Sequence, residues 1–133
     1  MDIPQTIPFT DEDRTHCIAA VHRMCYLADT ARHKGVLALQ NAVKDEPCFF
    51  LRQAIEIVTE GVDEESTYDI LTTLLQAQQY PSVELLERVI YMEGALSILN
   101  SVPPRMIEVR LSYMLGENFL AKGLYPPYAE WTD

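Results

Sequence analysis

The sequence predicts an all-α protein, with about five helices in an antiparallel bundle or helical array. Apolar residues recur every three or four positions along most of the chain, which is the spacing of one helix face. Alternation with a period of two never persists, and the chain has no Asn-Gly or Asp-Gly pair of the kind that forms hairpin turns. A chain of 133 residues fits one domain. We therefore expect a single helical domain over 1–133, with 1–9 and 124–133 as extended tails.

The first helix is predicted to begin after Thr10, an N-cap residue with Asp13 three positions later. The acidic residues 11–13 place negative charge at the positive end of the helix dipole. Apolar residues then continue at helical spacing to about Val43, and the helix could be interrupted at Gly35. This segment is expected to form either one long helix or two helices in line.

Turn and cap residues delimit the next two helices. Pro47 is a favourable first-turn residue for the second helix, and Gly61 is a suitable C-terminal cap. Asp63 is the predicted N-cap of a third helix over 64–79, which Tyr80-Pro81 ends because the residue before a proline avoids helical geometry.

The fourth helix is predicted over 83–100, with Ser82 as its N-cap. Its apolar positions cover more than half of the helix circumference, so we expect it to be the most buried element. Pro103-Pro104 breaks the chain, and Pro104 opens a fifth helix that runs to about Lys122 and closes at Gly123.

Charge and cysteine content limit the classes of partner and compartment. The chain has 20 acidic and 10 basic residues, and its net charge of -10 repels nucleic acid and anionic membrane surfaces. Three cysteines are an odd number, which argues against a disulfide framework and favours a reducing compartment, here the cytoplasm. The N-terminus has no signal-peptide features. The longest charge-free run, 70–83, is too short and too polar for a membrane span of about 20 residues.

Two groups of residues are candidate chemical sites. In "HCIAAVHRMC", His22 and Cys25 share a helix face as two metal ligands would, but His16 and Cys17 turn away and a zinc site needs at least three protein ligands. We therefore expect no metal, with the cysteines acting as small core residues. Glu93 lies on an apolar helix and is expected to be a partly buried acid bonded to a hydroxyl or to Arg105.

Sequence motifs for catalysis or nucleotide binding are missing. The chain has no G-x-S-x-G, no P-loop and no glycine-rich nucleotide fingerprint, and it contains five glycines in all. The sequence therefore predicts no enzymatic activity and no cofactor.

Three separated segments carry a family resemblance. They are "LADTARHKGVLALQ" (27–40), "FLRQAIEIVTEGVDEESTYDIL" (50–71) and "EGALSILNSVPPRMIE" (93–108). In this order they resemble the cytoplasmic parts of the MotA-type flagellar motor stator family. The third motif rests on Glu93, Gly94, Pro104, Arg105 and Glu108, together with Leu96, Ser97, Ile98 and Ile107.

The resemblance implies a stator-like head without the ion-conducting pore. In the family, two membrane helices stand between the second and third segments and two more precede the first, whereas here only residues 72–92 fill the gap. The expected function is that of a non-enzymatic adaptor or regulator that binds a protein partner, such as a motor or envelope component.

Three residues are the predicted partner-binding set. Arg32 stands where the family carries its rotor-facing arginine, and Lys34 and Gln40 belong to the same segment. Gln40 replaces a usual acidic residue, so half of the family's charge pattern is missing. The alternative for Arg32 is a structural ion pair with Asp29 at i, i+3.

In the family, the helix that carries the third motif packs on the other cytoplasmic helices. Leu96, Ile98 and Leu99 are therefore expected in a helix-on-helix core, each contributing about 1.5 to 3 kcal/mol at most. Gly94 would permit close approach of a neighbouring helix, and Ser97 could bond back to the preceding turn.

Two other function classes remain open. The chain could bind a small apolar ligand or form a weak dimer through its Tyr-rich end, "LYPPYAEW" (124–131), together with Tyr113. An enzyme built on Glu93 or on the cluster of His16, Cys17, His22 and Cys25 is the third class.

Overall fold

The computed structural model describes residues 8–132, and every regular element within them is a helix. The elements are α1 (Asp11–His16), α2 (Ile18–Lys34), α3 (Ala38–Ala42), α4 (Phe49–Thr59), α5 (Glu64–Gln76), α6 (Ser82–Leu99), α7 (Pro104–Tyr113) and α8 (Glu117–Ala121). The all-α prediction is confirmed, although the described chain forms more and shorter helices than the five expected.

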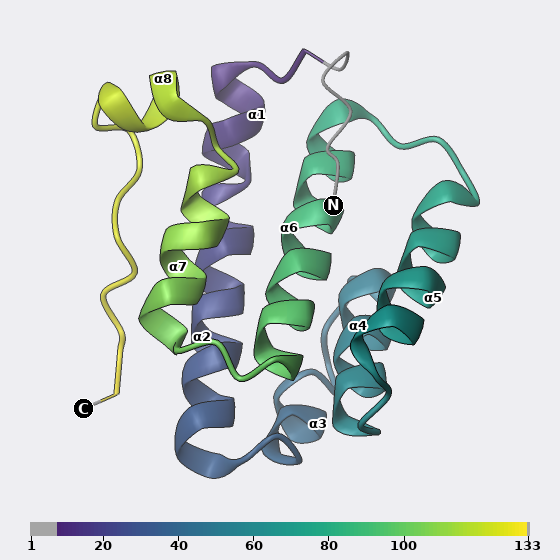
Figure 1. Ribbon diagram of the computed structural model, residues 1–133. Coiled ribbons are helices and arrows are strands. Elements are labelled where there is room, and N and C mark those ends of the chain that lie inside the picture. The colour runs from purple at the N-terminus through teal and green to yellow at the C-terminus, as the bar shows by residue number, and fades with distance from the viewer. Residues whose placement is uncertain (1–7, 133) are drawn as a thin grey trace.

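Three helices, α2, α6 and α7, pack side by side at the centre of the molecule (Figure 1). α2 and α6 run in the same direction, and α7 returns antiparallel to both (Figure 1). α4 and α5 cover one flank of α6, while the C-terminal segment lies on the outer side of α7 (Figure 1). The antiparallel arrangement is therefore only partial.

The predicted start of the first helix is confirmed by a capping box. Asp13 N donates to Thr10 Oγ1 at 3.0 Å, and Thr10 N donates to Asp13 Oδ2 at 3.1 Å. α1 and α2 are separated only by Cys17. These local bonds satisfy amide groups that the first turn of a helix leaves unpaired.

The prediction of a long or collinear helix up to Val43 is wrong. α2 ends at Lys34, and Gly35 adopts a φ of 85° that glycine alone tolerates without strain. The chain turns there, so that α3 packs against the end of α2 instead of extending its axis (Figure 1).

The second helix begins two residues after Pro47, with Cys48 as its N-cap, and Glu46 holds the chain just before it. Its carboxylate oxygen accepts the N–H of Cys48 at 2.9 Å, and α4 starts at Phe49. Gly61 follows the helix with a φ of 73°, in agreement with the predicted stop. Asp63 caps α5 by accepting the N–H of Ser66 at 3.0 Å, as predicted. α5 ends at Gln76, earlier than the predicted 79.

α6 contains more buried residues than any other described helix, as predicted. Ser82 is not its N-cap: Pro81 takes that position, and Ser82 Oγ lies 3.1 Å from Asp13 Oδ2 of α1. Leu96 and Ile98 are buried and Leu99 is half-buried. The predicted bond from Ser97 to the preceding turn is wrong, since its buried hydroxyl has no hydrogen-bond partner among residues 8–132.

Gly94 is the point of closest approach between α6 and α2, as predicted. A Cβ atom at this position would lie 2.7 Å from Met24 Cε and 3.1 Å from Met24 Cβ. Real Cβ atoms do not approach that closely, so the two helices can pack at this distance only when residue 94 has no side chain.

The single fifth helix predicted from Pro104 to Lys122 is divided in two. α7 ends at Tyr113, Gly116 adopts a φ of 92°, and α8 starts at Glu117. The break lets Leu115 and Phe119 enter the core, where both are almost fully buried. Residues 124–132 form no helix, as expected for a tail. No described helix combines the length and apolar character needed to cross a bilayer.

Candidate functional site

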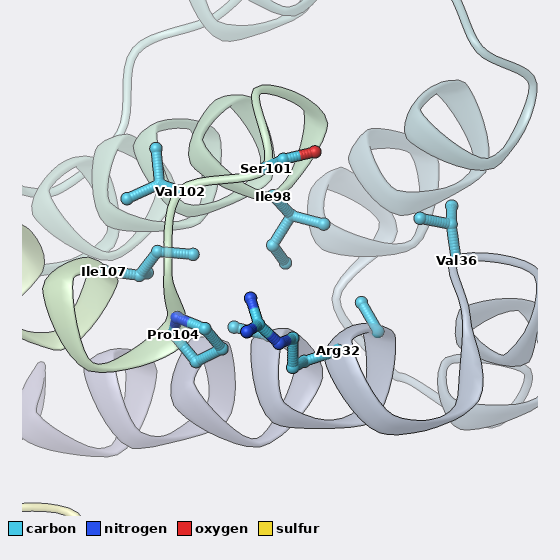
Figure 2. A pocket seen from close by; sticks show the side chains of 9 residues that line it. Arg32, Val36, Ile98, Ser101, Val102, Pro104 and Ile107 are labelled. Atoms are coloured by element: carbon cyan, nitrogen blue, oxygen red, sulfur yellow. The ribbon is translucent and has the colours of Figure 1, made fainter.

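An apolar groove of about 210 Å³ opens between the C-terminal half of α2 and the corner that joins α6 to α7. Figure 2 shows the side chains that line it. Ala28 and Ala31 come from α2, Ile98 from α6, and Val102, Pro104 and Ile107 from the corner and α7. Arg32, Val36 and Ser101 complete the lining.

The connection between α6 and α7 is short, and backbone hydrogen bonds fix its conformation. Ser101 has a φ of 57°, and the N–H of Val102 donates to the carbonyl of Ser97 at 3.0 Å, which closes the end of α6. Pro103 precedes α7, and its carbonyl accepts the N–H groups of Met106 and Ile107. Small alanines on α2 face this corner, so the space between them stays open.

Arg32 is the only charged residue in the lining of this groove. Its guanidinium points into the space between Pro104 and Ile98 (Figure 2). The alternative of an Arg32–Asp29 pair is wrong. The Asp29 carboxylate lies 3.2 Å from His33 Nδ1 and accepts the N–H of Thr132 at 2.9 Å instead.

The segment that contains Arg32 carries three basic residues and no acidic one. Residues 30–44 contain Arg32, Lys34 and Lys44 and no acidic residue. All three side chains are exposed, and none forms an ion pair with a described residue. Acidic residues of other segments lie beside two of them: Lys34 shares a hollow with Asp29 and Glu130, and Lys44 shares one with Glu56.

The other two predicted partner-binding residues lie elsewhere. Lys34 lines a second hollow of about 380 Å³ with Tyr26, Asp29 and Tyr128. Gln40 lines a third hollow with Arg52 and Glu56. Sequence reasoning thus found Arg32 but missed Ile98, Val102 and Ile107 as its neighbours in a groove. The Pro-Pro corner was visible in the sequence, but its position beside α2 was not.

The residues of the third motif have several separate roles. Glu93 lies 3.6 Å from Arg110 Nη2, so its predicted partner Arg105 was wrong. The Arg105 guanidinium lies over the Trp131 ring, 5.2 Å from its centroid. Glu108 accepts the hydroxyl of Tyr125 at 2.6 Å and the N–H of Tyr128 at 2.7 Å. Pro104 lines the groove and Gly94 contacts α2.

The histidine and cysteine residues considered as a chemical site do not converge on one site. Cys17 and Cys25 are fully buried, and burial raises the pKa of each thiol to about 12. Both therefore stay protonated at neutral pH, whereas a metal ligand or nucleophile acts as the thiolate. His22 Nε2 lies 2.7 Å from the Pro126 carbonyl oxygen and His16 is exposed. All three cysteines are free, and residues 8–132 contain no group of three or more ligands arranged for a metal.

The Tyr-rich C-terminal end is engaged with its own chain. Tyr125, Tyr128 and Trp131 are partly buried against the core, whereas Tyr113 on α7 remains 68% exposed. Of the aromatic residues proposed for dimerisation, only Tyr113 is thus freely accessible.

No protein-family model, curated protein or solved structure matches this chain. The kinship with the stator family therefore stays a prediction.

Proposed function

We propose that this protein is a non-enzymatic interaction module, and that its groove docks a segment of a partner protein that combines an apolar side chain with a carboxylate. One observation carries this proposal: an apolar hollow opens beside a single exposed arginine that has no described acidic partner. The residues of the alternative chemical sites have other contacts. Glu93 is paired with Arg110, and Cys17 and Cys25 are protonated in the core.

The size of the groove suits one or two side chains of a peptide. Its volume of about 210 Å³ lies below the roughly 300–1,000 Å³ of most small-molecule sites. Ile98 and Ile107 are already buried and form the floor of the groove, so the half-buried Val102 would contribute most of the apolar surface that a leucine or isoleucine of the partner covers. An anchor residue in a small pocket is the usual centre of a protein–protein contact.

Arg32 would supply the charged half of the recognition. A planar guanidinium binds a carboxylate with two parallel hydrogen bonds, which fixes orientation as well as affinity. The acid-free stretch from 30 to 44 would attract an acidic partner, while the acidic remainder of the chain would repel it. Arg32 would therefore be the one positive contact that the groove lining offers to an acidic partner.

The resemblance to the stator family suggests in which process the docking groove would act. Two of the resembling segments contribute to this groove, the first through Arg32 and the third through Pro104 and Ile107. We propose on this basis an adaptor or regulator that acts in the cytoplasm on a motor or envelope component. Three free cysteines support a reducing compartment.

Charge reversal at Arg32 is expected to weaken binding of an acidic amphipathic peptide about tenfold, because a charge-assisted hydrogen bond of about 1.5–3 kcal/mol becomes a repulsion. The probe is a short fluorescein-labelled peptide with leucines at helical spacing flanked by glutamates. Fluorescence anisotropy at an ionic strength of about 0.15 M, where the Debye length is about 8 Å, measures its Kd with wild type and with Arg32→Glu. Amide and methyl NMR shifts should concentrate on Ala28, Ile98 and Ile107.

Lys122→Glu is the control, because it makes the same change of charge directly after α8, at the opposite end of the molecule (Figure 1). Lys122 Nζ pairs with Asp11 Oδ2 at 3.0 Å, so the folding of this variant is checked by circular dichroism first. Its Kd should stay within about twofold of wild type, since exposed charges beyond a Debye length are screened. The proposal fails if a copy of the peptide with lysines in place of glutamates binds equally well, or if Arg32→Glu leaves the Kd unchanged.

A further inference from the structure

The C-terminal segment lies along the outer side of α7 as an extended strap, defined here as residues 125–132 (Figure 1). Gly123 adopts a φ of 70° after α8 and turns the chain back along the bundle. This face is separate from the docking groove, which uses Pro104 and Ile107 of α7.

The strap is held by hydrogen bonds to its main chain. Tyr128 N donates to Glu108 Oε2 at 2.7 Å, and Thr132 N donates to Asp29 Oδ2 at 2.9 Å. The Pro126 carbonyl oxygen lies 2.7 Å from His22 Nε2 and accepts from it. Bonds of this kind recognise an extended backbone at a fixed register, whatever side chains it carries.

The side chains of the strap repeat every third residue. Tyr125, Tyr128 and Trp131 are partly buried, whereas Pro126, Pro127, Ala129 and Glu130 are exposed. A period of three is that of a polyproline II helix, and two successive prolines favour that conformation before any contact forms. The three aromatic residues therefore face the bundle together.

Each aromatic residue has a defined contact on the bundle or on the strap itself. The Tyr125 hydroxyl donates to Glu108 at 2.6 Å, and its ring meets His22 edge to face with centroids 5.5 Å apart. Tyr128 packs against His22 and against Trp131, with centroids 5.7 Å and 4.8 Å apart. Arg105 lies over the Trp131 ring.

The receiving surface is formed by two helices alone. We name it the strap-binding face: His22 and Asp29 lie seven residues apart on α2, and Arg105 and Glu108 lie three apart on α7. Both spacings place the two side chains on one side of their helix. α2 and α7 pack directly on each other, so the four groups keep their relative positions whether or not the strap is bound.

We propose that the strap-binding face is a peptide-binding site for an extended segment with aromatic residues at every third position and prolines between them. Residues 125–131 are its resident occupant, and a partner protein with the same pattern competes for the face. The resident strap begins two residues after Gly123 on the same chain, so its effective concentration is on the order of millimolar or higher. A partner must displace it, which lowers the apparent affinity by the fraction of molecules in which the strap is released.

The test uses the full chain and a fluorescein-labelled peptide with the sequence GLYPPYAEWTD, residues 123–133. Wild type should bind it weakly. The variant Tyr125→Ala/Trp131→Ala loosens the resident strap but keeps all four residues of the face, so we expect the peptide to bind at least about tenfold more tightly. A gain would show that the face binds this segment without the covalent link to the chain.

Control variants separate specific binding of the peptide at the strap-binding face from a general destabilisation of the fold. Tyr113→Ala removes an aromatic residue outside the strap and should leave the Kd at the wild-type value. Glu108→Ala added to the loosened variant should abolish the gain, because the acceptor for Tyr125 and Tyr128 is lost. Should the double variant fail to fold, Trp131→Ala alone leaves the three main-chain bonds in place and should show a smaller gain.

Several results would overturn the proposal. They are equal affinity of loosened and wild-type chains for the peptide, equal affinity of the loosened chain for a scrambled peptide, and dimerisation of the full-length wild type at micromolar concentration in sedimentation. Dimerisation would assign the face to the strap of a second copy instead of a partner protein. None of these measurements involves Arg32, so the docking groove is tested independently.

Discussion

Gly94→Val is expected to lower the free energy of unfolding by about 3 kcal/mol, since overpacking a close-packed core costs typically 1–3 kcal/mol and sometimes more. The added Cβ would lie 2.7 Å from Met24 Cε and 2.8 Å from Met24 Cγ, and Met24 is itself fully buried. α2 and α6 would have to separate, which disturbs the centre of the bundle. Urea unfolding followed by circular dichroism measures the change.

A double-mutant cycle identifies the cause of this loss. Met24→Ala alone should cost about 2–5 kcal/mol by leaving a cavity. Combined with Gly94→Val, which fills part of that space, the total cost should fall short of the sum by at least about 1 kcal/mol. Ala19→Val controls for the helix propensity of valine at an exposed position of α2. Additive costs in the cycle would contradict close helix contact as the reason.

The free energy of unfolding is expected to fall steeply as the pH rises above about 9. Burial raises the pKa of Cys17 and of Cys25 from 9.0 to about 12 in the folded chain, so the unfolded state loses these protons first. Stability is then fully present below pH 9 and is lost up to about pH 12, at roughly 1.4 kcal/mol per pH unit for each thiol.

Two tyrosines add to the same alkaline loss. Burial raises the pKa of Tyr91 and of Tyr125 above the usual value near 10, and the hydrogen bond to Glu108 raises the Tyr125 pKa further. Urea unfolding between pH 7 and pH 11 measures the combined slope. Cys17→Ala/Cys25→Ala should remove most of the slope between pH 9 and pH 10, where tyrosine contributes least. An unchanged slope in this variant would show that the thiols are not its source.

Helix ends that depend on residues within one turn were predictable from the sequence. Thr10 with Asp13, and Asp63 with Ser66, close hydrogen bonds within one helical turn, so residues a few positions apart determine them. Gly61 likewise ends α4 through its own backbone conformation.

Interruptions of helices were less predictable. Gly35 and Gly116 break segments in which the apolar spacing continues on both sides, and a glycine in a helical pattern can be either tolerated or a stop. The outcome depends on whether the residues that follow the glycine are buried after a turn, as Leu39 and Phe119 are here. Burial of that kind is a property of the packed chain.

The candidate sites show the same division. The sequence indicated Arg32 as a candidate binding residue and Pro103-Pro104 as a break between helices. The groove itself exists only because residues some 70 positions apart lie on opposite sides of it. The C-terminal segment was predicted to be extended, but its hydrogen bonds to Glu108 and Asp29 join residues 20 and 103 positions away.

The sequence by itself determined the helical class, the N-caps Thr10 and Asp63, the buried character of α6 and the small residue at position 94. Each of these follows from spacing or from bonds within one or two turns of chain. Only the tertiary structure decided which helices run in the same direction, where α2 and the fifth predicted helix end, and which side chains meet in the groove and under the strap. These features depend on packing between distant segments, where many weak contacts outweigh local preference.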